Sequence, residues 1–198
     1  MPKLNKDIIF LILEELQNDR KALYSCLMVN RTWCETTVPI LWENPHPTKY
    51  SKNIKLVYTM FLHLSEESRE ILKNQEIDLF TETSQRPLFN YISFWRYLNL
   101  RSLDWILDSI TSVSLKKSVI RNEILKLLIN RNTRFTHIYI NIKFSIQLYL
   151  IPGAEDCFSE LKFLLYEDFR SKNKNVLEGF AGISKSITKL DFLSQDLI

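Results

Sequence analysis

The sequence predicts a mainly α-helical protein with a small α/β part, and three observations support this. Residues 4–42 carry apolar side chains at helical spacing in three short runs. Residues 54–131 continue the helical pattern. In the last third, an apolar-x-x-apolar-x-apolar motif begins at Phe135, Leu161 and Ile187, so its copies are 26 residues apart. Each copy is typical of a short strand, and we therefore expect short parallel strands alternating with helices there.

Residues that can start or stop a helix separate the first three runs. The first predicted helix spans about 6–16. A second begins at Asn18 or Asp19, and a third follows Asn30, because these side chains can accept hydrogen bonds from the free N–H groups of a first helical turn. Pro39 is expected to end the third helix, since a helix interior accommodates neither its ring nor its missing N–H.

The first of these helices, which Asn5 can cap, is too apolar for an ordinary surface helix. At about 100° per residue, its apolar side chains cover roughly half of its circumference or more, whereas a surface helix needs a narrower stripe. A unit of about 40 residues is also near the lower limit of independent stability. The unit therefore either packs on the rest of the chain or presents a docking surface to a partner.

The order of residues in this unit resembles an F-box. F-boxes open on Leu-Pro, then carry an acidic residue before paired aliphatics, a Val-x-Arg-x-Trp-like centre and a closing Leu-Trp, and Asn5 stands where the family usually has proline. The positions that match, in order, are Leu4, Asp7-Ile8-Ile9, Ile12-Leu13, Leu16, Leu23, Cys26, Val29-Asn30-Arg31-x-Trp33 and Leu41-Trp42.

The resemblance implies a function without chemistry on this chain. The chain would be the substrate-recognition subunit of an SCF-type cullin ubiquitin ligase, docking on the small adaptor subunit and, through it, on cullin. The alternative is a non-ligase F-box protein that acts as a structural or sequestering partner of the adaptor. The side chains that would divide between the F-box core and the adaptor interface are Leu4, Ile8, Ile9, Ile12, Leu16, Leu23, Val29, Trp33, Leu41 and Trp42.

Composition limits the other classes of function. The chain has 198 residues, 45% hydrophobic and 25% charged, which is ordinary for a globular protein of one or two domains. The net charge of +3 is mild and dispersed, so no nucleic-acid partner is expected. Charges interrupt the first 20 residues, and polar residues interrupt the apolar segment 135–151, so we expect no signal peptide and no membrane partner. These features favour an intracellular protein, cytoplasmic or nuclear.

Residues for catalysis or metal binding do not stand out. The sequence has no Gly-rich phosphate loop, no Gly-x-Ser-x-Gly and no His-Glu-x-x-His, and its three histidines lie far apart. Cys26, Cys34 and Cys157 show no metal-ligand spacing and are expected to be reduced thiols. We therefore predict no catalytic residues, no metal and no cofactor.

The chain is predicted to divide into three regions: the F-box at 1–43, a helical linker region at 44–115 and a repeat region at 116–198. A polar segment with two prolines, residues 43–53, marks the first boundary.

In residues 88–107, aromatic side chains interleaved with two arginines could stack on single-stranded nucleic acid. The same side chains fit helix faces packed in a core, and two arginines do not form a groove that follows phosphates, so we favour the core.

The 26-residue spacing of the C-terminal motif is typical of leucine-rich repeats, which are common behind F-boxes. The alternative is an ordinary sheet whose strands share the alternation by chance. In a repeat solenoid the motif's apolar positions point inward, and the residues between and after them face a surface that can bind a target protein. Those residues are His137, Tyr139, Asn141, Phe163, Leu165, Lys189 and Asp191. The third motif lies close to Ile198, so we expect the repeat region to be incomplete or its last unit to be covered by another chain.

Overall fold

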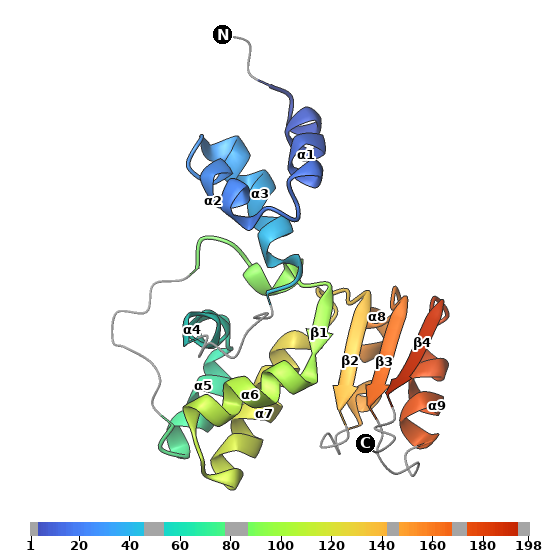
Figure 1. Ribbon diagram of the computed structural model, residues 1–198. Coiled ribbons are helices and arrows are strands. Elements are labelled where there is room, and N and C mark those ends of the chain that lie inside the picture. Colours follow the sequence, from blue (N-terminus) through green and yellow to red (C-terminus); the bar gives the residue numbers. More distant parts are fainter. Residues whose placement is uncertain (1–3, 46–53, 78–86, 142–146, 168–173, 194–198) are drawn as a thin grey trace, which may run out of the picture. The chain divides into compact units, whose positions relative to one another are not determined.

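The structure is a computed structural model that describes residues 4–45, 54–77, 87–141, 147–167 and 174–193. It is mainly helical and contains one parallel four-stranded sheet, which confirms the predicted fold class at that level (Figure 1). The chain divides into two compact units, residues 1–45 and 46–198, which we call the N-terminal and C-terminal units. Among the described residues, no helix has the length and apolar character that a membrane crossing requires.

The N-terminal unit consists of helices α1 (Lys6–Glu15), α2 (Arg20–Cys26) and α3 (Arg31–Glu43). Two of the predicted caps are confirmed. The Asp19 carboxylate accepts hydrogen bonds from two backbone N–H groups of α2, at 3.0 and 3.1 Å, and the Asn30 side chain accepts one from the first turn of α3, at 3.2 Å. Asn5 occupies the N-cap position of α1, but its side chain makes no capping bond and lies near Asp7 instead.

The prediction that Pro39 ends the third helix is wrong. Helix α3 continues through Pro39 to Glu43. Continuing the helix brings Leu41 into the core of the unit, where it is 7% exposed, and packs Ile40 and Trp42 against that core. The free energy gained by burying these apolar side chains therefore outweighs the cost of the backbone hydrogen bond that proline cannot donate.

A small core holds the three helices together. Five side chains from all three helices are buried in it, and five more pack partly against it. The buried members are Ile9, Leu13, Leu23, Cys26 and Leu41. The partly buried members are Leu16, Leu27, Trp33, Ile40 and Trp42. The core takes only one stripe of α1, so the other apolar side chains of that helix lie outside it.

The C-terminal unit begins with helices and ends with strands that alternate with helices. The Ser65 hydroxyl caps the second of its helices by accepting a hydrogen bond from the Ser68 N–H at 3.1 Å. The elements are, in order, α4 (Ile54–Leu62), α5 (Glu66–Asn74), η1 (Tyr91–Phe94), β1 (Tyr97–Asn99), α6 (Leu100–Ile110), α7 (Ser114–Leu128), β2 (His137–Asn141), η2 (Leu148–Leu150), α8 (Ala154–Cys157), β3 (Phe163–Glu167), α9 (Lys174–Ile183) and β4 (Lys189–Leu193).

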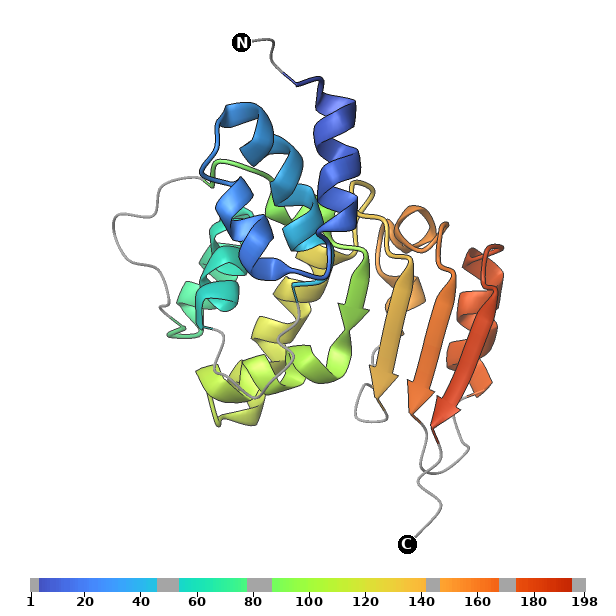
Figure 2. The same ribbon diagram turned by 45° about the horizontal axis from the view of Figure 1, so that its top comes forward.

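All four strands run parallel in the order β1-β2-β3-β4 (Figure 2). The register aligns Ile138 with Leu164 and Leu164 with Leu190, so the 26-residue spacing of the motif becomes a column of side chains across the sheet. The prediction of short parallel strands at the three motif copies is therefore confirmed.

Strand β1 was not predicted, although it carries the same motif. Trp95, Leu98 and Leu100 repeat the apolar-x-x-apolar-x-apolar order, and all three are buried. Leu98 pairs with Ile138, which lies 40 residues later rather than 26, because both α6 and α7 stand between the two strands. A boundary between 115 and 116 does not fit this sheet, since β1 precedes it and β2 follows it. The structure instead places residues 46–198 in one unit.

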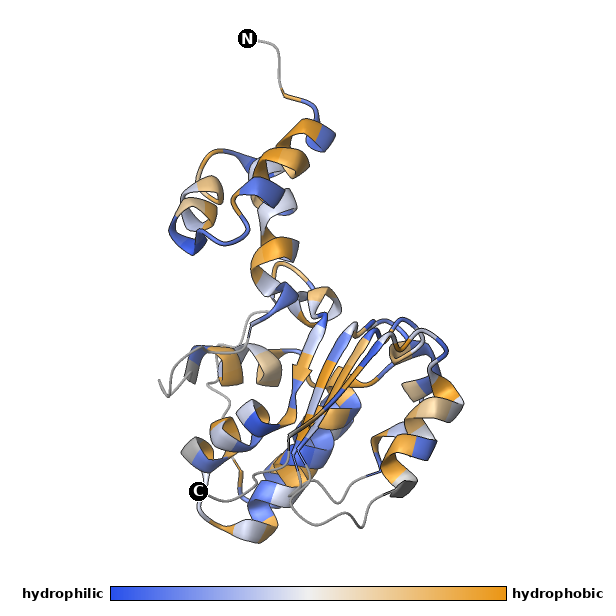
Figure 3. Ribbon diagram, turned by 45° about the vertical axis from the view of Figure 1, so that its right-hand side comes forward, coloured by the Kyte–Doolittle hydropathy of each residue, from blue (hydrophilic) through white to orange (hydrophobic). Residues whose placement is uncertain are grey.

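Helices α8 and α9 cover one face of the sheet (Figure 3). On β2 and β3, the inward positions of the motif are 1–3% exposed. The aromatic rings of Phe135, Phe158 and Phe180 meet in this layer, with centroids 6.1 and 5.1 Å apart. Of the aromatic side chains in residues 88–107, Trp95 is buried, Trp105 is 42% exposed and the others are partly buried, so the interpretation as core holds for only part of this segment.

The last copy of the motif departs from the prediction. Leu190 and Phe192 are 44% and 57% exposed, although both were expected to point into a core. They lie on β4, at one end of the sheet, and no further strand lies beside them among the described residues.

Candidate functional site

Large exposed apolar side chains are concentrated on the N-terminal unit. Eight of the sixteen found among the described residues fall between residues 4 and 29. We call these eight the docking surface: Leu4, Ile8, Phe10, Leu11, Ile12, Tyr24, Met28 and Val29. Their exposed fractions run from 37% at Ile12 to 86% at Met28. Three of them, Ile8, Leu11 and Ile12, share one face of α1, and exposed apolar side chains gathered on one face are typical of a protein-protein contact.

The structure divides the ten residues expected to form the F-box core or the adaptor interface. Ile9, Leu23 and Leu41 are buried in the core of the unit. Leu16, Trp33 and Trp42 pack partly against it. The remaining four, Leu4, Ile8, Ile12 and Val29, belong to the docking surface.

Four residues of the docking surface were not among the expected contact residues: Phe10, which is 45% exposed, and Leu11, Tyr24 and Met28, which are each more than half exposed. For Leu11, helical geometry was the available signal. Ile8, Leu11 and Ile12 are spaced i, i+3 and i+4, so they share a face about 100° wide, opposite the stripe through Ile9 and Leu13 that enters the core. For Tyr24 and Met28 the sequence offers no comparable signal.

The second surface is the sheet face opposite helices α8 and α9. Its first row across the strands is Tyr97, His137, Phe163 and Lys189. The Tyr97 and His137 rings stack with centroids 4.1 Å apart, and the His137 and Phe163 rings follow at 5.6 Å. The Lys189 ammonium lies 5.0 Å from the Phe163 ring centroid, in cation-π geometry. This row is a series of three neighbouring rings, of which Tyr97 and His137 are stacked and Phe163 is tilted, and it ends in a cation.

The second row is Asn99, Tyr139, Leu165 and Asp191. Together with the first row we call it the open face. Lys189 on this face is exposed, and His137, Tyr139, Phe163, Leu165 and Asp191 are partly buried, so six of the seven residues expected to face a target reach this surface.

The seventh residue, Asn141, is buried, with 8% of its surface exposed. The prediction that it faces the surface is therefore wrong. Asn141 pairs with Glu167 in the third row, and Glu167 is itself buried. The Glu167 carboxylate accepts a hydrogen bond from the Tyr139 hydroxyl at 2.5 Å and lies 3.5 Å from the Arg101 guanidinium. A polar network of the chain's own side chains thus occupies this end of the sheet.

This network changes the acidity of Tyr139. Burial, together with its hydrogen bond to the Glu167 carboxylate, raises the pKa of the Tyr139 hydroxyl. The hydroxyl therefore stays protonated and donates at neutral pH. Arg101 also lies 5.0 Å from the Trp105 ring centroid, which adds an aromatic contact at the border of the open face.

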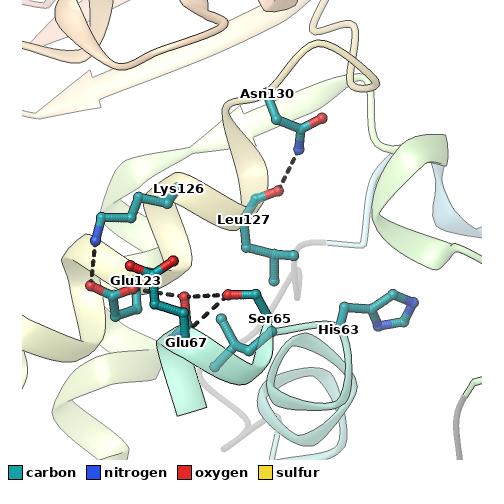
Figure 4. Close-up of a pocket in the computed structure, with 9 residues that line it drawn as sticks. His63, Ser65, Glu67, Glu123, Lys126, Leu127 and Asn130 are labelled. Carbon is teal, nitrogen blue, oxygen red and sulfur yellow. Dashed lines mark hydrogen bonds and ion pairs between the residues drawn. The ribbon is translucent and has the colours of Figure 1, made fainter. Parts of the chain in front are cut away.

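A cavity of about 500 Å³ lies between α5 and α7 within the C-terminal unit, and its lining is partly polar and partly apolar (Figure 4). Hydroxyl groups connect in series there: Ser65 donates to Ser68 at 3.1 Å, and Ser68 donates to the buried Glu123 carboxylate at 2.7 Å. The ammonium of Lys126 binds the other oxygen of Glu123 at 2.7 Å. The buried carboxylate thus has a donor at each oxygen.

His63 lines the same cavity, but its ring nitrogens lie near the carbonyl oxygens of Thr59 and Phe89, at 2.8 and 3.1 Å. It therefore does not contact the Ser68–Glu123 pair as the base of a catalytic triad would. Burial raises the pKa of the Cys157 thiol to about 11, which disfavours its nucleophilic thiolate form. Among the described residues, no group of three or more His, Cys, Asp and Glu side chains is arranged to hold a metal ion.

Comparison with family profiles, curated proteins and solved structures gives no match for this chain.

Proposed function

We propose that this chain is a substrate receptor of an SCF-type cullin ubiquitin ligase, acting inside the cell. The docking surface would bind the small adaptor subunit, and the open face would hold a target protein. The chain contributes no reacting group of its own.

The docking surface is the observation that carries the proposal. A unit with five fully buried core residues exposes eight large apolar side chains, and three of these form one face of α1. The order of residues that resembles an F-box spans the same segment. An apolar surface carried mainly by α1, with Tyr24 on α2 beside it, suits a helical partner, because helix-to-helix contacts bury such side chains efficiently.

The open face has features that suit protein recognition. Its stacked rings present large, rigid contact area at a small cost in conformational entropy. Its charges are already balanced, since Lys189 lies 3.1 Å from Asp191 and Arg101 lies 3.5 Å from Glu167. A target segment can therefore bind there through apolar and aromatic contacts without leaving an unpaired charge buried.

The proposed mechanism is an increase in effective concentration. A receptor that binds the adaptor and the target at once holds the target's lysines near a recruited ubiquitin-conjugating enzyme. Tethering of this kind turns a second encounter into an intramolecular one, with effective concentrations in the range of about 1 mM.

Affinity purification of the tagged full chain, with identification of the co-purifying proteins, tests the proposal. Recovery of both the adaptor and cullin is the expected result. Recovery of the adaptor without cullin would indicate the alternative, a non-ligase partner of the adaptor. Absence of the adaptor from the purified material, with the chain folded by circular dichroism, would contradict both.

A further inference from the structure

The outer edge of strand β4 combines exposed apolar side chains with an available backbone edge. In the column of the sheet that ends at Leu190, the three preceding residues, Leu98, Ile138 and Leu164, are each 1% exposed, whereas Leu190 is 44% exposed. The neighbouring column rises from 2% at Ile140 to 57% at Phe192. Within the described residues, Leu190 and Phe192 thus lack the cover that buries the matching side chains of the other strands, including Leu98 on β1 at the other end of the sheet.

The backbone of β4 alternates between its two sides. The N–H groups of Thr188 and Lys189 both donate to the Lys162 carbonyl, at 2.9 and 3.0 Å, so the regular alternation begins with Lys189, which faces β3. Successive residues of a strand direct their N–H and C=O groups to opposite sides. Leu190 and Phe192 therefore direct theirs away from β3, where another strand can pair with them.

We propose that a second copy of this chain pairs with this edge, so that two β4 strands lie antiparallel about a two-fold axis at Leu190. The two sheets then become one continuous sheet. In this arrangement Leu190 faces Leu190 of the second copy, and the two residues can exchange a pair of N–H to C=O hydrogen bonds. Phe192 of each chain lies opposite Thr188 of the other, and the exposed apolar side chains of both copies cover one another.

The charges of Lys189 and Asp191 favour this register, and they favour a second copy of the chain as the partner. An antiparallel pair centred on Leu190 places Lys189 opposite Asp191 of the second copy, twice by symmetry. Within one chain these two side chains are 3.1 Å apart, so the four charges of the dimer alternate around a square. A register centred on Asp191 would oppose two carboxylates, and one centred on Lys189 would oppose two ammonium groups. Like charges directly opposite each other are destabilising.

Helix α9, which precedes β4, leaves room for a neighbour. A Cβ added at Gly182 meets no atom within 4 Å, and both Ala181 and Gly182 are exposed. The pairing itself involves about five residues a side. We therefore expect a weak dimer, with a Kd on the order of 10 µM, rather than an obligate one.

Charge-swap variants of the full chain test the pairing by sedimentation equilibrium. Lys189→Asp and Asp191→Lys should each weaken self-association roughly 30-fold, because each turns two attractive pairs into repulsive ones. An equimolar mixture of the two variants should form heterodimers with affinity close to that of the wild type, because opposite charges face each other again. The double variant K189D/D191K should also dimerise. Lys21→Glu, an exposed reversal in the N-terminal unit, is the matched control and should leave association unchanged.

Thermal unfolding of each variant separates loss of pairing from loss of fold. A wild-type chain that stays monomeric at about 200 µM, well above the expected Kd, would overturn the inference. Two single variants that fail to associate when mixed, while both remain folded, would overturn it as well. The inference does not depend on the proposed ligase function, since it concerns only the C-terminal unit and uses no adaptor.

Discussion

Replacing Ile8, Leu11 and Ile12 together by alanine should abolish tight adaptor binding while leaving the chain folded. The three residues are 45%, 56% and 37% exposed, so a partner that covers them buries the equivalent of about 1.4 side chains. Full burial of such a side chain is worth about 2 kcal/mol, which gives about 3 kcal/mol, or roughly 100-fold in Kd. Because none of the three lies in the core, the melting temperature should change little.

Isothermal titration of the full chain with the adaptor subunit measures this effect. Leu115→Ala provides a matched control, since Leu115 is a 66% exposed apolar residue on α7 in the C-terminal unit, and should bind like the wild type. Leu13→Ala is a contrasting control, because Leu13 is fully buried and its loss should cost about 2–5 kcal/mol of stability. Binding of the triple variant within threefold of the wild type would refute the assignment of this face to the adaptor.

Three further predictions concern the cysteines and glycines. The pKa of Cys157 is raised from 9.0 to about 11, so the protonated thiol contributes about 2–3 kcal/mol to folding stability below pH 9. This contribution is lost as the pH rises from 9 to 11. Cys157→Ala should therefore flatten the fall in stability that denaturant titration measures between these two pH values. Replacing Cys26, Cys34 and Cys157 singly by serine should not abolish ubiquitin transfer in a reconstituted ligase, and a reducible ubiquitin adduct on any of them would contradict the receptor mechanism. Gly182→Ala should stabilise α9 by up to about 1 kcal/mol, because the new Cβ would meet no atom within 4 Å. Gly179→Ala should destabilise the helix, because its new Cβ would lie 2.4 Å from the ring of Tyr149. Thermal melts of the two variants measure both effects.

The sheet was predictable where the sequence repeats evenly. Copies of the motif at Phe135, Leu161 and Ile187 lie 26 residues apart, and the structure places them in adjacent parallel strands. The copy at Trp95 was not recognised from the sequence, because two helices lie between β1 and β2 and the spacing between these two copies is therefore 40 residues. An even period detects only those strands whose connections have equal length.

The candidate surfaces were predictable only in part, because alternation along a strand gives the face of a side chain but not what covers it. His137 and Tyr139 reach the open face as expected. Asn141 shares their side of the strand yet is buried, since it pairs with Glu167, which Tyr139 and Arg101 hold in place. Contacts between residues far apart in the sequence decide such cases, and local patterns carry no information about them.

The docking surface illustrates a different limit. The sequence indicates that α1 has more apolar side chains than one core can accept, and the structure identifies which of them remain outside. A three-helix unit of this size can enclose a single stripe of α1, which here runs through Ile9 and Leu13. Every other apolar residue of that helix must face outward, whatever its partner is. Polar substitutions on the outer face should therefore separate partner binding from folding, which substitutions on the inner stripe cannot do.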